Sequence, residues 1–486
     1  YTGVNGGMIL AVADDQGMHS SQNEQDSRHY AIAAKLPMVE PSDSKECKDF
    51  IKAAYEISED FDTPVLFRLS TRVSHSQSIV EECPREEKPL KDYVKNPQKY
   101  IMMPAYAKKK HPEVEARTAA IAEFAAESAL NRVERGTDAA IGIITSGTSY
   151  QYVREVFGDS ASVLKLGIVN PLPEKLIRDF ADSVEKLYVV EELDGIIENF
   201  CRAHGVEVAG GKDMFSPIGE FSQRTVAQAF GKALPDAVSA DSAVPVRPPM
   251  MCSGCPHRGL FYTLAKNKIT VLGDIGCYTL GAQQPLNALD STLCMGASVS
   301  GLHGFNKADG GASAGKSVCV IGDSTFMHSG ITGLVNIAYN DSPSTVIILD
   351  NSITGMTGHQ QNPTTGYNIK GDAASKVDLE TLCHAVGIKR VRVVDPYDLK
   401  ACETAVKEEL AVPEASVIIS RRPCVLLKYV KTAPALHVTD KCKGCKSCMR
   451  LGCPSISMKN GRASIDATLC VGCKVCEQLC AFGAIE

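Results

Sequence analysis

One stretch decides the fold of this chain, Val318–His359, which reads VCVIGDSTFMHSGITGLVNIAYNDSPSTVIILDNSITGMTGH. Its first apolar run ends at Gly322-Asp323, a helical segment follows, and a second apolar run ends just before Asn351. This order of strand, turn, helix and strand predicts a βαβ unit with Asp323 and Asn351 at the carboxyl ends of two parallel strands. A carboxylate and a carboxamide are hard oxygen donors that suit Mg²⁺ bridging a diphosphate, and a glycine lets the backbone approach the phosphate closely.

The same pattern resembles the signature of thiamine-diphosphate enzymes, a Gly-Asp-Ser or Gly-Asp-Gly turn followed later by Asn. Here GDS at 322–324 is followed, after 25 residues, by DN at 350–351. The resemblance implies thiamine diphosphate as cofactor and Mg²⁺ bound by Asp323, Asn351 and the backbone carbonyl of Ile353. Turns of this kind also occur in α/β proteins without the cofactor, so the two motifs alone leave both interpretations open.

The composition describes a globular protein of several domains. The chain has 486 residues, 44% of them apolar, and a formal net charge of −6. That length is enough for about three or four domains. No apolar run approaches the ~18 residues that span a bilayer, and no stretch is basic enough to indicate nucleic-acid binding. With no export signal evident, we expect a cytoplasmic protein with neither a membrane nor a nucleic acid as partner.

Alternating strand and helix patterns predict an α/β protein with several doubly wound parallel-sheet domains and a small C-terminal α+β domain. The resemblance implies that the larger domains are of the thiamine-diphosphate-binding type. The expected domains are a partial pyrimidine-binding-type α/β domain at 1–80, a charged crossover at 81–135 with a helix near 117–132, a transketolase C-terminal-like α/β domain at 136–240, a thiamine-diphosphate and Mg²⁺-binding domain at 245–430, and a ferredoxin-like domain at 432–486. Further strands are predicted at 64–69, 163–168, 186–190, 268–272, 390–394 and 416–419.

The first residues predict an incomplete domain. The apolar run at 7–13 is typical of a buried strand, and no recognisable start precedes it. We therefore expect that the chain has lost the beginning of this domain. After the strand, Ser42 or Asp43 is expected to cap a helix, because a short polar side chain accepts a bond from the first helical turn.

Cysteine is the outlier of the composition, because eight of the 19 cysteines fall within the last 45 residues. There the chain reads CKGCKSCMRLGCP and then CVGCKVCEQLCA, two runs of three closely spaced cysteines with a fourth further on. Three such thiolates bind three irons of one cubane, and the fourth of each run reaches the other cluster. The predicted [4Fe–4S] ligand sets are Cys442, Cys445, Cys448 and Cys480 for one cluster, and Cys470, Cys473, Cys476 and Cys453 for the other.

Zinc is the rival for cysteine pairs of this spacing, but zinc needs two pairs and not two runs of three plus one. Two details depart from the commonest ferredoxin pattern: one extra residue precedes Cys453, and Ala481 rather than proline follows Cys480. A segment of about 50 residues builds little core of its own, so we expect a separately folding tail that depends on its clusters for stability.

A thiamine site and iron–sulfur clusters on one chain suggest that a carbanion made from a 2-oxo acid is oxidised in one-electron steps. The chain resembles the 2-oxoacid:ferredoxin oxidoreductase family, and within it the large subunits that oxidise indolepyruvate. The resemblance covers essentially the whole chain. It rests on GMHSSQNEQDSR at 17–28, TRVSHS at 71–76, SGCPHR at 253–258, the GDS and DN motifs, and the cysteine-rich tail.

The resemblance implies oxidative decarboxylation of arylpyruvates, indolepyruvate first among them, to arylacetyl-CoA, with electrons passed through the two clusters to ferredoxin. It also implies a small beta subunit as partner, coenzyme A as acyl acceptor and an anaerobic setting. The implied cofactor-binding residues are Cys255, Pro256, His257, Ile275, Gly276, Cys277, Met295, Gly296, Ala297, Gly322, Asp323, Ser324, Asn351, Thr354 and Gly355.

No side chain is assigned as the catalytic base, because in this family the aminopyrimidine of the cofactor performs the deprotonation. His257 is a candidate, although a histidine beside a proline turn as often caps the backbone. The glutamate that assists the aminopyrimidine would lie in the missing beginning, since Glu24 and Glu40 come too late in the domain.

Two other functions stay open on the sequence alone: a non-redox thiamine-dependent lyase or decarboxylase with structural clusters, and an electron-transfer subunit whose thiamine fold is vestigial. The eight cluster cysteines argue against the first, and the intact Asp323 and Asn351 argue against the second. Cys252, Cys255 and Cys277 suggest a further metal site, but their spacing indicates no regular coordination.

Overall fold

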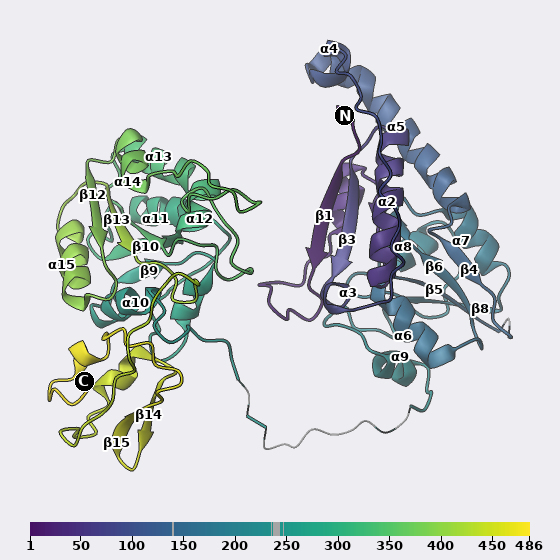
Figure 1. The fold of residues 1–486 in the computed structure, drawn as a ribbon. Helices are drawn as coiled ribbons and strands as arrows, with labels where there is room; N and C mark the ends of the chain where they lie inside the picture. The colour runs from purple at the N-terminus through teal and green to yellow at the C-terminus, as the bar shows by residue number, and fades with distance from the viewer. Residues whose placement is uncertain (139, 235, 237–243, 246) are drawn as a thin grey trace. The chain divides into compact units, whose positions relative to one another are not determined.

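The computed structural model describes residues 1–138, 140–234, 236, 244–245 and 247–486 (Figure 1). They form two compact units, Tyr1–Ala240 and Asp241–Glu486. Sheets flanked by helices occur in both units, which confirms the predicted α/β class. Over the described residues, no helix has both the length and the apolar character that crossing a membrane requires.

The first unit contains two four-stranded sheets, ordered β1-β3-β2-β7 and β4-β6-β5-β8. The strands of both sheets contribute to one hydrophobic core, which includes Leu66 of the first sheet and Ile144 of the second. The strands are β1 Ile9–Asp14, β2 Met38–Val39, β3 Val65–Ser70, β4 Arg132–Glu134, β5 Ile141–Ser146, β6 Ser162–Leu166, β7 Ile168–Asn170 and β8 Lys186–Val190. Each sheet of the first unit has one antiparallel edge pair, β2–β7 or β4–β6, and is otherwise parallel. The helices are α1 Arg28–Ala34, α2 Ser44–Asp60, α3 Thr71–His75, α4 Pro97–Tyr100, α5 Pro104–Glu127, α6 Gly147–Phe157, α7 Glu174–Ala181, α8 Ile196–Ala203 and α9 Gln223–Ala229.

Three expectations for this unit need correction. Strand β1 forms, but it is an edge strand that pairs only with β3, so side chains such as Leu10 are exposed and not buried. Helix α5 begins at Pro104, well before the predicted start at 117, because its buried stripe already includes Val114. The single strand predicted at 163–168 is two strands in two sheets, because the Asn131 side-chain oxygen accepts the N–H groups of Gly167 and Ile168 and interrupts the ladder.

Other local predictions are confirmed. The Asp43 side chain caps α2 by accepting from the backbone N–H of Glu46 at 2.8 Å. Strands β3 and β8 lie where they were expected. Figure 1 shows α2 beside the sheet of β1 and β3. Phe50, Ala54 and Ile57 of the helix pack against that sheet.

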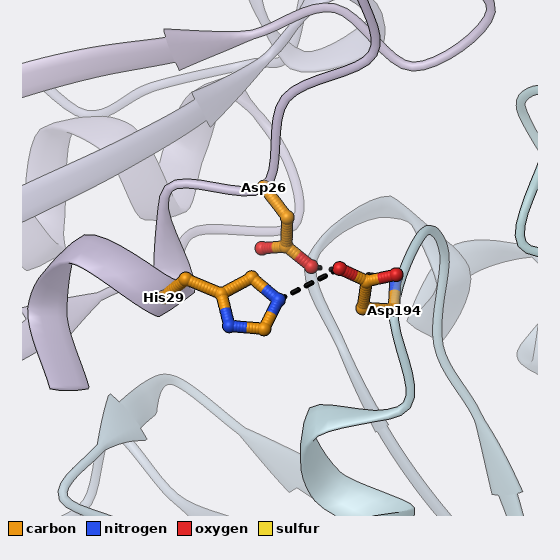
Figure 2. A group of neighbouring side chains, drawn as sticks. All are labelled: Asp26, His29 and Asp194. Carbon is orange, nitrogen blue, oxygen red and sulfur yellow. Dashed lines mark hydrogen bonds and ion pairs between the residues drawn. The ribbon is translucent and has the colours of Figure 1, made fainter. Parts of the chain in front are cut away.

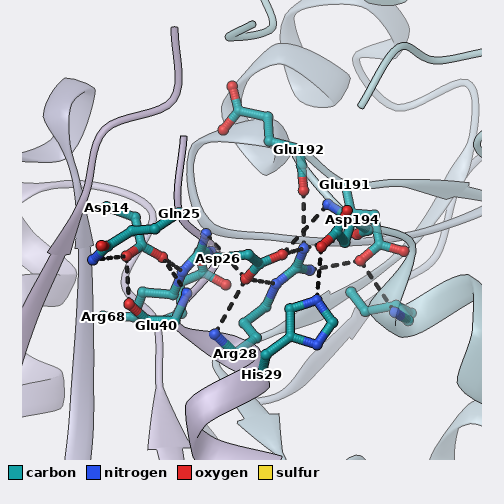
Figure 3. A network of polar contacts seen from close by, with 12 residues as sticks. Asp14, Gln25, Asp26, Arg28, His29, Glu40, Arg68, Glu191, Glu192 and Asp194 are labelled. Carbon is teal, nitrogen blue, oxygen red and sulfur yellow. Dashed lines mark hydrogen bonds and ion pairs between the residues drawn. The ribbon is translucent and has the colours of Figure 1, made fainter. Parts of the chain in front are cut away.

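A buried ion-pair network joins the two sheets of the first unit (Figure 3). It contains two guanidinium groups and four carboxylates, all of them nearly inaccessible: Arg28, Arg68, Asp14, Asp26, Glu40 and Glu191. Glu192 takes part through its backbone carbonyl, which accepts from Arg28 at 2.9 Å. Arg68 in β3 donates to Asp14 at 2.6 Å and to Glu40, while Arg28 donates to Asp26 and, at 2.6 Å, to Glu191 beyond β8. Among the described residues, Glu40 Oε2 and Arg68 Nη2 have no hydrogen-bond partner, although Arg68 Nη2 lies 3.7 Å from Asp26 Oδ1. Such atoms raise the cost of burying the network.

The exposed end of this network is shown in Figure 2, where His29 Nε2 lies 2.7 Å from Asp194 Oδ2 and Asp26 lies beside them. Asp26 already accepts two bonds from the Arg28 guanidinium, at 2.8 and 2.6 Å. The group is therefore the rim of the ion-pair network.

The second unit is built on a five-stranded, fully parallel sheet in the order β12-β13-β11-β10-β9. Its strands are β9 Thr270–Leu272, β10 Ser317–Gly322, β11 Thr345–Asp350, β12 Arg390–Val394 and β13 Ser416–Arg421. Its helices are α10 His257–Lys266, α11 Ala297–Ala308, α12 Asp323–Thr325, α13 Ile331–Tyr339, α14 Leu379–Ala385 and α15 Leu399–Leu410, with the 3₁₀ helix η1 Cys277–Ala282 and the π-helical turn η2 Phe326–Gly330. All five predicted strands are present, and the β10–α12/α13–β11 unit is the predicted βαβ motif.

The cysteine-rich tail is a small region with one antiparallel hairpin, β14 Ile456–Lys459 and β15 Arg462–Ile465, and two 3₁₀ turns, η3 Ser447–Leu451 and η4 Glu477–Leu479. Its apolar residues belong to the same core as α10 and the parallel sheet, and the tail lies within the second compact unit. It is thus not the separately packed module that was expected, because so short a segment buries its apolar side chains against the larger domain.

The Arg68→Met substitution should cost about 3–5 kcal/mol in the free energy of unfolding, because it leaves the carboxylates of Asp14 and Glu40 buried without their partner. Urea denaturation of the purified chain measures this. Lys175→Met is the matched control, since Lys175 forms only an exposed helical pair with Asp179, and its unfolding midpoint should stay at the wild-type value. Equal midpoints for both variants would contradict a structural role for the network.

Candidate active site

A cavity of about 230 Å³ opens at the carboxyl ends of β10 and β11, where the βαβ motif was expected to place its polar residues. The predicted residues that line it are His257, Ile275, Gly276, Cys277, Met295, Gly322, Asp323, Ser324, Asn351, Ile353, Thr354 and Gly355. Four other predicted residues, Cys255, Pro256, Gly296 and Ala297, lie in the neighbouring turns but do not line the cavity. The structure thus brings together turns that are far apart in the sequence.

Asp323 is a buried carboxylate at the start of α12. Burial, together with the nearby Asp350, raises the pKa of Asp323 to about 7. The Asp323 carboxylate accepts from the Ser324 N–H at 2.8 Å, and its Oδ2 accepts from the Thr364 hydroxyl at 3.1 Å and the Asn362 amide at 3.4 Å. These three donors fix the orientation of the carboxylate, and a bound divalent cation would keep it ionised.

The two residues of the DN motif have different surroundings. The Asp350 carboxylate forms an ion pair with Arg421 of β13 at 2.8 Å. Asn351 lines the cavity, and its side-chain oxygen accepts from the N–H of Ile353 at 3.3 Å. The oxygen donors Asp323, Asn351 and the carbonyl of Ile353 therefore belong to one cavity, and their chemistry fits Mg²⁺.

One buried carboxylate, Asp274, ties two of the turns together. It accepts from the N–H of Ile275 in its own turn at 2.8 Å, and from the N–H groups of Gly296 and Ser298 at 2.9 and 3.3 Å. The last two belong to the N-terminus of α11, where a negative charge is favourable. Asp274 therefore holds the 273–277 turn against the 294–298 turn, which explains how Met295 and Cys277 reach the same cavity.

Sequence reasoning missed six residues that also line the cavity: Tyr278, Thr325, His328, Leu349, Met356 and Thr357. Tyr278 is the most informative, because its ring fills the space in front of Gly322 and Gly276, where an added Cβ would meet it at 2.8 and 2.5 Å. Its hydroxyl donates to the carbonyl of Ile275 at 2.9 Å. In the sequence, the one indication that Tyr278 belongs to the site is that it directly follows the predicted turn at 275–277.

His257 begins helix α10 and is almost completely buried, with its ring edge-on to Tyr278 at 5.8 Å between centroids. Burial lowers the pKa of His257 to about 4, so its imidazole is neutral at physiological pH. A neutral imidazole that lines the cavity offers one acceptor and one donor nitrogen to a bound molecule.

Four of the eight tail cysteines, Cys442, Cys445, Cys448 and Cys480, line one small cavity. Burial raises the pKa of Cys476, and the neighbouring thiols of Cys473, Cys453, Cys470 and Cys448 raise it further. The division of the eight cysteines into two ligand sets stays a prediction. In the first group the N–H groups of Ala463 and Ala484 donate to the sulfurs of Cys442 and Cys480 at 3.4 and 3.2 Å.

The sulfurs of the tail cysteines are not arranged as they would be around one zinc ion. Four thiolates around one Zn²⁺, at about 2.3 Å each, lie roughly 3.8 Å from one another. Within the part of the chain that the structure describes, no three cysteine sulfurs lie within 4.8 Å of one another. The corners of a cubane are further apart, and [4Fe–4S] clusters stay the prediction for both groups.

Four more cysteines lie near one another beside the cavity: Cys252, Cys255, Cys277 and Cys424. Burial raises the pKa of Cys277, with Cys424 and Cys252 as the neighbouring thiols. Burial also raises the pKa of Cys255, to which Cys252 and Cys277 contribute. Their sequence spacing indicated no coordination, because the fourth member, Cys424, follows β13 and reaches the group only through the sheet.

Comparison with known proteins adds independent findings. Residues 274–420 match the family described as thiamine pyrophosphate enzyme, C-terminal TPP binding domain. The chain is 38% identical, over 517 residues, to the indolepyruvate oxidoreductase subunit IorA of Archaeoglobus fulgidus, covering 100% of this chain and 82% of the relative. It is 37% identical over 537 residues to the subunit of the same name from Pyrococcus horikoshii, covering 100% and 83%. Among solved structures, the 2-oxoglutarate:ferredoxin oxidoreductase from Magnetococcus marinus covers 39% of this chain and 68% of its own at 17% identity, and its TM-score of 0.32 is too low to support a conclusion.

Asp323→Asn should weaken Mg²⁺-dependent thiamine-diphosphate binding at least about 100-fold, because it removes an anionic metal ligand that no neighbour replaces. For the wild-type chain, the same affinity should fall about tenfold for each pH unit below 7, since Mg²⁺ must then displace a proton from Asp323. Calorimetric titration between pH 5.5 and 8 measures both. Asp341→Asn, an exposed carboxylate in the same domain, is the control and should bind like wild type. Full affinity in Asp323→Asn would remove Asp323 from the metal site.

Proposed function

The chain belongs to the family of indolepyruvate oxidoreductase IorA subunits, thiamine-diphosphate-dependent 2-oxoacid:ferredoxin oxidoreductases, and from this we propose that it oxidises arylpyruvates, indolepyruvate first among them. The net reaction converts the 2-oxo acid and coenzyme A to arylacetyl-CoA and CO₂, and releases two electrons and one proton. Each ferredoxin accepts one electron. The name of the relatives as subunits implies another subunit, which we propose is a small beta subunit.

The observation that carries this proposal is the packing of an oxygen-lined cavity and a cysteine-rich tail into one unit. The hydroxyl groups of Ser253, before the 254–258 turn, and Ser455, in the tail, are 2.7 Å apart. An added Cβ at Gly254 would meet Val471 of the tail at 2.2 Å, so backbone and tail are in direct contact there. A site for carbon chemistry next to sites for electron transfer supports an oxidoreductase over a lyase.

Thiamine diphosphate, when bound, supplies the electron sink for cleaving the bond between the carbonyl and carboxylate carbons of a 2-oxo acid. Asp323, Asn351 and the carbonyl of Ile353 would hold Mg²⁺ and through it the diphosphate. Gly322 lines the cavity just before α12, and its missing side chain leaves room for the Tyr278 ring. The neutral His257 offers a hydrogen bond without bringing a charge to the cavity.

The apolar side chains at the cavity support an aromatic substrate. Ile275, Met295, Leu349 and Met356 line it alongside Tyr278. Met295 and Met356 are about half exposed, so their flexible side chains can adapt to an aryl group that enters.

The cysteine groups would hold the iron–sulfur clusters, which exchange single electrons when bound. We assign the ligand sets as the sequence predicts: Cys442, Cys445, Cys448 and Cys480, and Cys470, Cys473, Cys476 and Cys453. We further propose that Cys252, Cys255, Cys277 and Cys424 form a third ligand set beside the cavity, since these thiols from three segments lie near one another.

Iron analysis after anaerobic purification tests these ligand sets. The chain should contain about twelve irons if all three groups hold a [4Fe–4S] cluster and about eight if only the tail does. Cys445→Ser should lower the content by about four irons and leave thiamine-diphosphate affinity unchanged, because Cys445 is exposed and does not line the thiamine cavity. The buried Cys383, outside all three groups, provides the control substitution Cys383→Ser. An unchanged iron content in Cys445→Ser would show that the assignment is wrong.

Substrate preference is measured by anaerobic assay of the chain with its partner subunit, coenzyme A and a viologen dye. We expect dye reduction with indolepyruvate, phenylpyruvate and 4-hydroxyphenylpyruvate, with the highest kcat/KM for indolepyruvate. CO₂ release without dye reduction would instead indicate a lyase, and neither signal would indicate a vestigial thiamine site.

A further inference from the structure

The two cysteine groups of the tail have different surroundings. The group of Cys453, Cys470, Cys473 and Cys476 is the inner one, because Val471, within its segment, lies against Gly254 of the parallel-sheet domain. There Gln478 donates to the carbonyl of Tyr397 at 2.7 Å and accepts from the N–H of Leu399 at 3.0 Å. The outer group, Cys442, Cys445, Cys448 and Cys480, has its hydrogen bonds within the tail, and Cys445 is exposed.

The rim of the outer group carries a concentrated positive charge. Lys441, Lys443 and Lys446 are all exposed, and the segment 441–451 contains no acidic residue. Among the described residues, none of the three lysines is in an ion pair, whereas the adjacent Asp440 is paired with Arg462 at 2.6 Å. Three exposed lysines without ion-pair partners make the surface of this short segment positively charged, and such a surface attracts an acidic partner.

An apolar centre accompanies this charge. Phe482 is 46% exposed and lines the same small cavity as Lys443, Lys446 and the four outer cysteines. Met458 and Ile485 complete its apolar side. An exposed aromatic residue inside a charged rim is the usual arrangement of a protein-binding surface, in which the charges steer the encounter and the apolar contact holds the complex.

We propose that Lys441, Lys443, Lys446 and Phe482 form the docking surface for a small acidic electron-carrier protein. The inference rests on the proposed function, which needs an acceptor at the end of the chain of redox sites, and it names the place where that acceptor binds. An acidic partner complements the lysine rim, and Phe482 beside the exposed Cys445 positions it over the outer group. Electron-transfer complexes of this kind are small and salt-sensitive, which suits a short rim.

The test compares three forms of the iron-loaded holoenzyme. They are the wild type, the docking variant Lys441→Gln/Lys443→Gln/Lys446→Gln, and a control variant, Lys316→Gln/Lys389→Gln/Lys400→Gln, which removes the same charge from exposed positions of the parallel-sheet domain. The probe is a purified [4Fe–4S] ferredoxin of negative net charge. Its Kd is measured by calorimetry at low salt and again at about 0.5 M salt, where exposed charges are screened.

The docking variant should bind the ferredoxin about tenfold or more weakly than wild type at low salt, and the difference should shrink at high salt. The control variant should bind like wild type. Phe482→Ser should weaken binding at both salt concentrations, because an apolar contact is not screened. Equal loss in the docking and control variants, or no loss in either, would overturn the proposal.

Viologen reduction with an arylpyruvate separates this proposal from the function on which it rests. In the docking variant, iron content and dye reduction should remain at the wild-type level while ferredoxin binding falls. If the wild type reduces no dye with any arylpyruvate, the proposed function fails. If dye reduction is normal and ferredoxin binding is unaffected by the three substitutions, only the docking surface fails.

Discussion

The parallel pairing of β10 with β11 is the constraint on which the site depends. Because both strands run in the same direction, Asp323 and Asn351 reach one edge of the sheet although 27 residues separate them. The turn that follows β9 lies at the same edge, so Asp274 can accept from the N-terminus of α11 and bring a second pair of turns to the cavity. The cost of burying the Asp323 carboxylate is offset by its donors Ser324, Asn362 and Thr364, and a bound divalent cation would offset it further.

Prediction from the sequence worked where a local pattern has a direct structural meaning. Apolar runs that end in GD and DN locate strand ends, and strand ends in a parallel sheet share an edge, so Asp323 and Asn351 could be placed in one cavity without coordinates. The spacing of the cysteines was informative in the same way, because Cys442, Cys445, Cys448 and Cys480 do line one small cavity. The metals that these residues would bind stay a prediction.

Prediction failed where the deciding contact comes from elsewhere in the chain. The division between β6 and β7 is made by Asn131, whose side chain competes for two backbone N–H groups more than thirty residues away. Tyr278 lines the cavity because two glycines leave room for its ring, and no periodicity reveals such a fit. The thiols of Cys277 and Cys424 are 147 positions apart, and only the order of strands in the sheet brings them near each other.

The tail and the parallel-sheet domain share one hydrophobic core, so oxidation of the tail would also affect the domain. Tail residues such as Leu451 and Val475 pack into the same cluster of side chains as Leu260 and Phe261 of α10, the helix that begins at His257. If the inner group of tail cysteines binds iron, its oxidative loss would therefore remove support from the wall of the thiamine cavity as well as from the electron path. Such a molecule would bind the organic cofactor less tightly and would also transfer fewer electrons. Oxidation of the inner group would then impair both parts of the proposed reaction together.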